Sequence, residues 1–204
     1  MESLSPTRDA DATRERILDA AFERFVAHGF AGASMREIAQ AAGVTKSLIH
    51  HHFGTKRALW DEVKNRALQH YTGQQMQLLE TAAEADRALL GEAVRTFFAY
   101  LRDHPRVVRL LAWTHIEGDR RIGRLDAELI RLGSERIRAA QQAGRIRDDL
   151  NPVHIVCTFV HACTHWFVAA SHHADWPGVG SDEEFLEDFL KIFLDGLLPA
   201  ARSG

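Results

Sequence analysis

The chain has 204 residues, of which 46% are hydrophobic, and its formal net charge is −3. This length and hydrophobic content suffice for one domain or two small ones with a substantial core, which excludes a disordered chain. The first 65 residues hold nine Lys or Arg and nine Asp or Glu. Composition therefore does not by itself indicate a nucleic-acid-binding protein, and any such binding must depend on how the charges are arranged.

The N-terminal sequence MESLSPTRDADATRER is polar and lacks the apolar region of a signal peptide. The two cysteines, Cys157 and Cys163, lie within an apolar helical stretch, where the spacing fits neither a disulfide framework nor a zinc ribbon. We therefore expect a cytoplasmic protein without a cofactor.

The first predicted helix covers residues 13–30. Apolar residues recur along one of its faces, namely Ile17, Ala20, Ala21, Phe25 and Val26. Gly29 stands near its end, where a left-handed C-cap residue is expected.

The segment SMREIAQAAGVTKSLIHHHF, residues 34–53, predicts two short helices joined by a tight turn. Ser34 and Glu37 have the spacing of a capping box, which marks the start of the first helix. Gly43 occupies the turn, where a positive φ is expected, and Thr45 is placed to cap the second helix. This arrangement is typical of a helix-turn-helix, although Ala-Gly-Val segments also occur in ordinary helical hairpins.

Hydrogen-bonding side chains with no evident core partner follow the turn, and a DNA major groove would supply partners for them. Arg57 is expected on the same side, with acids such as Glu15 and Asp19 elsewhere. The predicted DNA-binding residues are Ser34, Arg36, Thr45, Lys46, Ser47, His50, His51 and Lys56.

This first third of the chain resembles the TetR family of transcriptional regulators. The residues that carry the resemblance, in the order and spacing of the family, are Thr13, Arg14, Ile17, Leu18, Ala20, Ala21, Phe25, Gly29, Phe30, Ser34, Ile38, Ala39, Ala42, Gly43, Val44, Thr45, Phe53, Lys56 and Leu59. Family members usually carry a tyrosine at the position of His50, directed toward the DNA backbone. An imidazole there predicts DNA binding that depends on pH, because histidine ordinarily titrates near ~6.5.

Helical periodicity continues beyond this segment with little sign of strands, so we expect an all-α protein of about nine helices. The predicted later helices cover residues 56–82, 86–104, 105–117, 120–143, 152–173 and 182–198. The expected domains are a DNA-binding domain with the helix-turn-helix at 1–55 and a helical effector-binding and dimerisation domain at 56–204.

The predicted helix at 152–173 contains no Asp, Glu, Lys or Arg. Its histidines, cysteines, serine and threonines argue against a membrane span and favour burial on most faces within protein. The helix at 182–198 has an apolar arc wider than one contact requires. We therefore expect both helices to join those of a second copy, so that a homodimer presents two recognition helices to a DNA operator.

An aromatic-rich set with a few polar atoms predicts a pocket for a small apolar or aromatic effector, whose binding releases a repressor from DNA. Its candidates are Phe97, Leu101, Trp113, Phe159, Cys163, Trp166 and Phe167. For any one of them, plain core packing is the competing interpretation.

Two other function classes stay open at this point. His154, Cys157, His161 and His165 share one helix face, which allows a zinc- or copper-responsive regulator, although one face seldom completes a tetrahedral site. A helical thiol enzyme is a remote alternative, because the chain lacks HExxH, G-x-S-x-G and Walker motifs. The sequence thus predicts a regulator that is not an enzyme.

Overall fold

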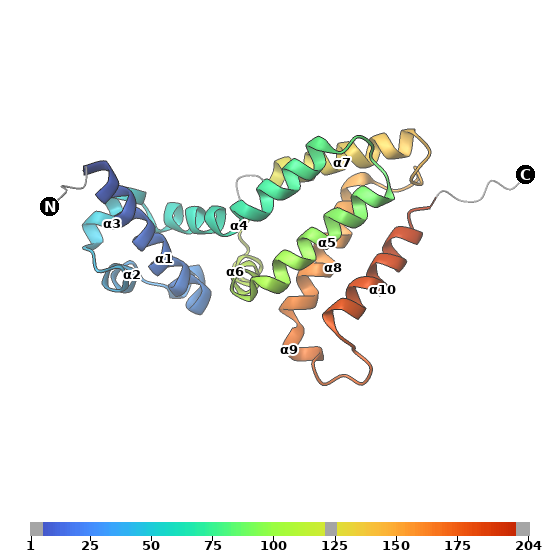
Figure 1. Ribbon diagram of the computed structural model, residues 1–204. Helices are drawn as coiled ribbons and strands as arrows, with labels where there is room; N and C mark the ends of the chain where they lie inside the picture. The colour runs from blue at the N-terminus through green and yellow to red at the C-terminus, as the bar shows by residue number, and fades with distance from the viewer. Residues whose placement is uncertain (1–5, 121–125, 199–204) are drawn as a thin grey trace, which may run out of the picture. The chain divides into compact units, whose positions relative to one another are not determined.

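The computed structural model describes residues 6–120 and 126–198, in which every regular element is a helix (Figure 1). The expected all-α fold is confirmed. The helices are α1 (Pro6–Gly32), α2 (Met35–Ala42), α3 (Lys46–Phe53), α4 (Lys56–Thr81), α5 (Arg87–Asp103), α6 (Pro105–Ile116), α7 (Asp126–Gln142), α8 (Pro152–Val168), α9 (Ala170–His173) and α10 (Asp182–Asp195). The predicted start of α7 at residue 120 leads into residues 121–125, which lie outside the described part.

The single helix predicted at 152–173 is instead two helices, because the chain turns at Ala169, which has φ −93° and ψ 5°. The turn is held by side chains from both sides of it. The His173 ring stacks on Trp166 with centroids 4.2 Å apart, and His173 Nε2 lies 3.0 Å from the Trp166 carbonyl oxygen. This break accounts for ten helices in the described residues rather than nine.

Contacts divide the chain into two compact units. The first holds the described residues up to Leu68 together with those from Arg109 to residue 120. Its core is built around Phe25 and Trp60, whose rings meet edge to face at 4.9 Å, with Ile17, Ile38 and Ile49 fully buried beside them. The expected domains, 1–55 and 56–204, stay a prediction about function. By contacts, the first half of α4 and most of α6, from Arg109 onward, belong with α1, α2 and α3.

The second unit holds Gln69–Val108 and the described residues from 126 onward. Within it, α8 packs against α5 and α7, and α10 packs against α5. Gln75 is 3% exposed, and its amide donates a 2.8 Å hydrogen bond to the Ala93 carbonyl oxygen. The remaining core is mostly aliphatic and aromatic.

The uncharged helix α8 is buried on one face only. Ile155, Phe159 and Cys163 are buried, whereas His154 and His161 are exposed. The expectation that this segment is buried on most faces is therefore wrong for a single chain. Within residues 6–120 and 126–198, no helix combines the length and hydropathy that a bilayer span requires.

Candidate nucleic-acid interface

The N-terminus of α2 is fixed by Ser34, as the sequence predicts. Its hydroxyl accepts a 3.1 Å hydrogen bond from the backbone N–H of Glu37. Hydrogen bonds from the Ser34 hydroxyl and backbone lower the pKa of the Glu37 carboxyl. Met35, Ile38 and Ala39 are buried beneath this cap, whereas Arg36 is exposed. The start of α2 thus presents a cation to solvent.

The turn between α2 and α3 depends on Gly43, which adopts the left-handed conformation with φ 65° and ψ 36°. The Gly43 and Val44 N–H groups donate to the carbonyl oxygens of Gln40 and Ala39 at 3.2 and 3.0 Å. Thr45 then caps α3, since its hydroxyl accepts a 3.2 Å hydrogen bond from Leu48 N–H. The predicted turn and cap are both confirmed.

Helix α3 has one buried anchor, Ile49, and a polar exposed surface. Lys46, Ser47 and His51 are exposed, and no ion pair ties Lys46 to another described residue. A short helix with free donors on its outer side has the form of a recognition helix that reads base edges and phosphates.

His50 is exposed, but one ring nitrogen is already engaged. Nδ1 lies 2.6 Å from the carbonyl oxygen of Gly54, which ends α3 with φ 73°. Because a carbonyl oxygen only accepts, Nδ1 carries the proton. The neutral ring therefore presents Nε2 as an acceptor, and only the imidazolium donates a hydrogen bond outward.

The cations at the start of α4 differ in their availability. Lys56 lies over the Phe30 ring, with Nζ 4.7 Å from the centroid, and Nζ donates a 3.4 Å hydrogen bond to Ala31. These contacts within the protein explain a cation at a helix N-terminus without any phosphate. Arg57 forms an ion pair with the buried carboxylate of Asp119. Arg57 is itself exposed, so its expected place on the DNA side stays a prediction, while the ion pair ties its guanidinium to a buried acid of this unit.

The candidate effector residues fall into separate groups. In the second unit, Phe97 and Phe159 meet at 6.3 Å, and Leu101 and Cys163 are fully buried. Phe167 packs on Phe98 at 4.7 Å, and Trp166 stacks on Phe185 at 3.9 Å and donates to Asp182. Trp113 lies in the first unit, where its indole N–H donates a 3.1 Å hydrogen bond to the Val26 carbonyl oxygen. Trp113 is thus not brought together with the others.

Two tyrosines that the sequence analysis missed join the first of these groups. The Tyr71 ring lies 5.0 Å from Phe97 and 5.3 Å from Tyr100. Burial raises the pKa of Tyr71 strongly and that of Tyr100 to about 12. Both phenols are neutral donors at physiological pH. The buried face of α4 beside Tyr71 could have been found from the helical spacing of Leu68, Thr72, Gln75 and Leu79. It is hard to recognise in the sequence because two of these four residues are polar.

The two thiols are predicted to differ sharply in reactivity. Burial raises the pKa of Cys163 to about 12, and its side chain is 0% exposed. At pH 8 its thiolate fraction is then on the order of one part in ten thousand, and the thiolate is the reactive form. We expect a maleimide to label half-buried Cys157 in the native protein and Cys163 at least about 100-fold more slowly. Mass spectrometry of Cys157→Ser and Cys163→Ser variants, native and in urea, checks this; equal native rates would contradict it.

The proposed metal ligands do not form a site in the described chain. His154, His161 and His165 are exposed on α8 and Cys157 is half-buried. Among the described residues, no three His, Cys, Asp or Glu side chains are grouped as a metal ion would require. This geometry gives no support to the metal-responsive alternative.

Comparison with known proteins matches both parts of the chain to family models. The model described as bacterial regulatory proteins, tetR family, matches residues 17–63. The model described as the tetracyclin repressor-like C-terminal domain matches residues 89–184. The first match contains α2, α3 and the turn between them.

Relatives match along nearly the whole chain. The HTH-type transcriptional repressor NicS of Pseudomonas putida is 27% identical over 204 residues, covering 96% of this chain and 95% of that protein. The crystal structure of the transcriptional regulator SCO4942 from Streptomyces coelicolor is 24% identical, with a TM-score of 0.69 and coverage of 91% and 98%. The transcriptional regulator FadR from Bacillus subtilis, in complex with stearoyl-CoA, is 14% identical, with a TM-score of 0.67 and coverage of 90% and 99%. These relatives are regulators of transcription rather than enzymes.

Proposed function

This chain belongs to the TetR family of DNA-binding bacterial regulatory proteins, and on that premise we propose that it is a homodimeric repressor that a small apolar or aromatic effector releases from a palindromic operator. The observation that carries the DNA contact is the exposed surface of α3. Lys46, Ser47 and His51 are exposed while Ile49 anchors the helix. Ser34, Arg36, Thr45, His50 and Lys56 complete the proposed interface, with phosphate contacts that orient α3 in the major groove.

Exposed apolar side chains on α8 and α10 support the dimer. Ile192 is 75% exposed, and Val153 and Val168 are 38% and 39% exposed. A second copy seated on these helices would bury them in a four-helix bundle with two-fold symmetry. The two α3 helices would then enter successive major grooves about 34 to 36 Å apart. Sedimentation at micromolar concentration tests this, and a monomer there contradicts the dimer.

The aromatic residues of the second unit support an apolar or aromatic effector. Phe97, Phe159 and Tyr71 contact one another or share a neighbour, and the thiol and phenol groups beside them are neutral. Because these side chains offer no charge to pair with a charged ligand, the part of the effector that they contact is expected to be uncharged. FadR from Bacillus subtilis, which has the same fold, was solved in complex with stearoyl-CoA, a ligand with a long apolar portion. The effector would bind more tightly to the conformation that does not bind DNA. The ratio of its affinities for the two conformations sets the limit on how far it lowers DNA affinity.

Selection of bound sequences from random duplex DNA by the purified protein tests the function. We expect a palindrome whose half-sites are centred about one helical turn or a multiple of it apart. Lys46→Gln should weaken binding to this duplex, whereas Lys191→Gln on α10 should not. A screen for small molecules that release the selected duplex follows. Enrichment of no sequence, or of a single half-site bound by a monomer, would contradict the proposal.

DNA affinity is expected to rise as the pH falls, because His50 can donate to a phosphate only as the imidazolium. With Nδ1 held by the Gly54 carbonyl, protonation at Nε2 turns an outward acceptor into a charged donor. Such a charged contact is worth roughly tenfold in affinity per protomer. Fluorescence anisotropy with the selected duplex measures it. His50→Tyr should flatten the profile and His70→Tyr, an exposed position in the second unit, should not; equal pH dependence of His50→Tyr and the parent would contradict the idea.

A further inference from the structure

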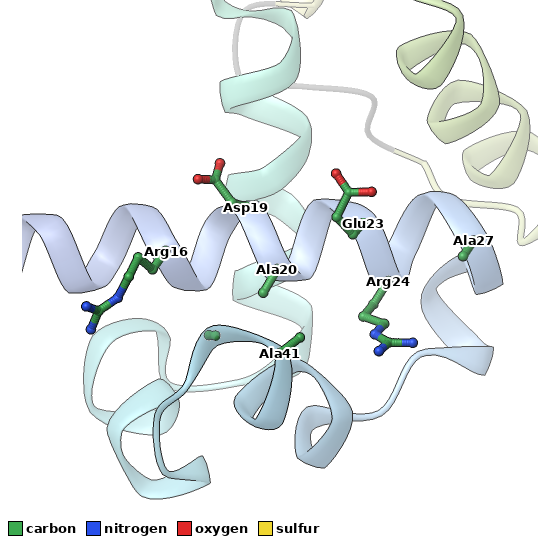
Figure 2. Close-up of a pocket in the computed structure, with 8 residues that line it drawn as sticks. Arg16, Asp19, Ala20, Glu23, Arg24, Ala27 and Ala41 are labelled. Carbon is green, nitrogen blue, oxygen red and sulfur yellow. The ribbon is translucent and has the colours of Figure 1, made fainter.

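An open groove of about 460 Å³ runs between α1 and α2 in the first unit (Figure 2). Alanines supply its apolar lining: Ala20, Ala27, Ala41 and Ala42. Charged side chains of α1 flank it. Figure 2 shows Arg16 and Arg24 extending toward the side on which α2 lies, whereas Asp19 and Glu23 extend from the opposite side of α1.

Most cations around α4 in this unit are neutralised by carboxylates. Arg14 pairs with Glu62, Arg57 and Lys64 pair with Asp119, and Arg66 pairs with both Glu15 and Asp19. Arg16 and Arg24 differ, since neither forms an ion pair with a described residue. The one hydrogen bond from Arg16 to another described side chain goes to the Thr13 hydroxyl at 3.2 Å.

The negative side of the groove is compensated within the protein. The Asp19 carboxylate lies 2.5 Å from an Arg66 nitrogen, and Arg66 also reaches Glu15 at 2.8 Å. Beside α2, the nearby acid is Glu37, whose carboxyl interacts electrostatically with Arg24 but forms no ion pair with it among the described residues. Arg16 and Arg24 are thus the cations of this groove that are not held in an ion pair. This side adjoins α2, which carries the exposed Arg36 and the N-terminal cap at Ser34.

We propose that Arg16 and Arg24 bind phosphates of one DNA strand, flanking the bases that α3 contacts, so that the groove between α1 and α2 extends the DNA interface. The inference rests on the proposed DNA contact of α3. Guanidinium groups bind phosphate oxygens in a bidentate manner. Eight residues along a helix separate the two arginines by about 12 Å, which matches about three to four phosphates at about 3.4 Å of duplex axis each.

The position of the groove beside α2, next to the turn that leads into α3, favours DNA over an acidic protein segment as the occupant. The first 65 residues have no excess of cations, with nine Lys or Arg against nine Asp or Glu. Ion pairs consume Arg14, Arg57 and Lys64. Phosphate contacts must therefore come from the cations left over, and Arg16 and Arg24 add to Arg36, Lys46 and Lys56. The lining from α2 is alanine, so no long side chain at Ala41 or Ala42 stands in the way of a sugar-phosphate strand.

The dependence of DNA affinity on salt concentration tests this proposal. Log K falls as log[salt] rises, and each lost phosphate contact lowers the magnitude of this slope, which is the quantity compared below, by about 0.9. With the duplex selected from random DNA, Arg16→Gln/Arg24→Gln is expected to lower the slope by about 1.8 per protomer and to weaken binding at least tenfold at about 50 mM salt. The matched control is Arg95→Gln/Arg138→Gln, which removes the same charge from exposed positions in the second unit and should leave the slope unchanged.

A gain-of-function variant guards against misfolding. Ala41 is exposed on α2 and lines the groove, and lysine is a good helix former. Ala41→Lys is expected to raise the slope by about 0.9 per protomer, while Ala41→Glu should weaken binding. A double variant with an unchanged melting temperature and an unchanged slope overturns the proposal, and that is the result expected if a protein segment occupies the groove. The proposed DNA contact of α3 fails by a different result: the Lys46→Gln variant would bind the selected duplex with the affinity and sequence preference of the parent protein.

Discussion

Replacing Asp119 by alanine is expected to destabilise the first unit by about 3 to 5 kcal/mol, the cost of breaking a buried ion pair from one side. The Asp119 side chain is 2% exposed and that of its partner Lys64 is 1% exposed. One carboxylate oxygen accepts from Lys64 Nζ at 2.6 Å and from the Trp60 indole at 2.7 Å, and the other accepts from Arg57.

The loss arises mainly from the ammonium group left behind. Without Asp119, Lys64 keeps Asp61 at 3.1 Å, but that carboxylate is 40% exposed and holds Arg57 as well. Asp119→Asn retains an acceptor for Trp60 and should cost less than Asp119→Ala. Lys64→Met added to Asp119→Ala should recover most of the lost stability, because it removes the unpaired buried charge.

Urea unfolding of the four proteins of this double-mutant cycle measures the coupling between the two side chains. Asp188→Ala is the matched control, since Asp188 pairs with Lys191 on the surface of α10 and should contribute no more than about 0.5 kcal/mol. A stability of Asp119→Ala within about 1 kcal/mol of the parent would contradict the account. So would a double variant no more stable than Asp119→Ala.

The sequence predicted those parts of the interface that depend on neighbouring residues. Ser34 and Thr45 cap helices through hydrogen bonds to residues three positions later, and Gly43 turns the chain through its own backbone. Such interactions are complete within a few residues, so the pattern of residue types contains them. The register of α2 and α3, and hence the exposed position of Lys46, follows from these caps.

The parts that the sequence did not predict depend on contacts between distant residues. Arg57 was expected at the DNA, yet its partner Asp119 stands 62 positions later. Trp113 was grouped with the effector candidates by its aromatic character, whereas its indole N–H bonds to Val26, 87 positions earlier. The break at Ala169 has no Gly or Pro to mark it and is held by the stacking of His173 on Trp166. Helical periodicity contains no information on such partners.

Gly29 is the position at which a single methyl group should have the second large effect. Its φ of 70° and ψ of −177° fall in a region that is essentially restricted to glycine. A Cβ there would also lie 2.7 Å from Cε3 and 2.9 Å from Cδ2 of Trp113, whose indole is fixed by its hydrogen bond to Val26. The Glu117 carboxylate, which accepts from the Phe30 and Ala31 N–H groups, lies equally close.

We expect Gly29→Ala to destabilise the protein by about 2 to 5 kcal/mol, from about 1 to 3 kcal/mol of backbone strain and a similar cost of displacing the indole. Calorimetry should show a melting temperature lower by about 5 to 15 °C. Gly43→Ala separates the two terms, because φ is 65° there but nothing lies within 4 Å of the added Cβ. It should cost about 1 to 2 kcal/mol.

The second control is Gly73→Ala, in the interior of α4 with no atom near the new methyl group, which should stabilise the protein by about 0.5 to 1 kcal/mol. The excess of Gly29→Ala over Gly43→Ala then reports the contacts with Trp113 and Glu117. Because the Trp113 contact joins α6 to the end of α1, Trp113→Ala in the Gly29→Ala background should remove the part of the excess that is due to the indole. Equal losses in the free energy of unfolding for Gly29→Ala and Gly43→Ala would mean that α6 shifts to accommodate the methyl group. The Trp113 indole would then not hold the end of α1 in place.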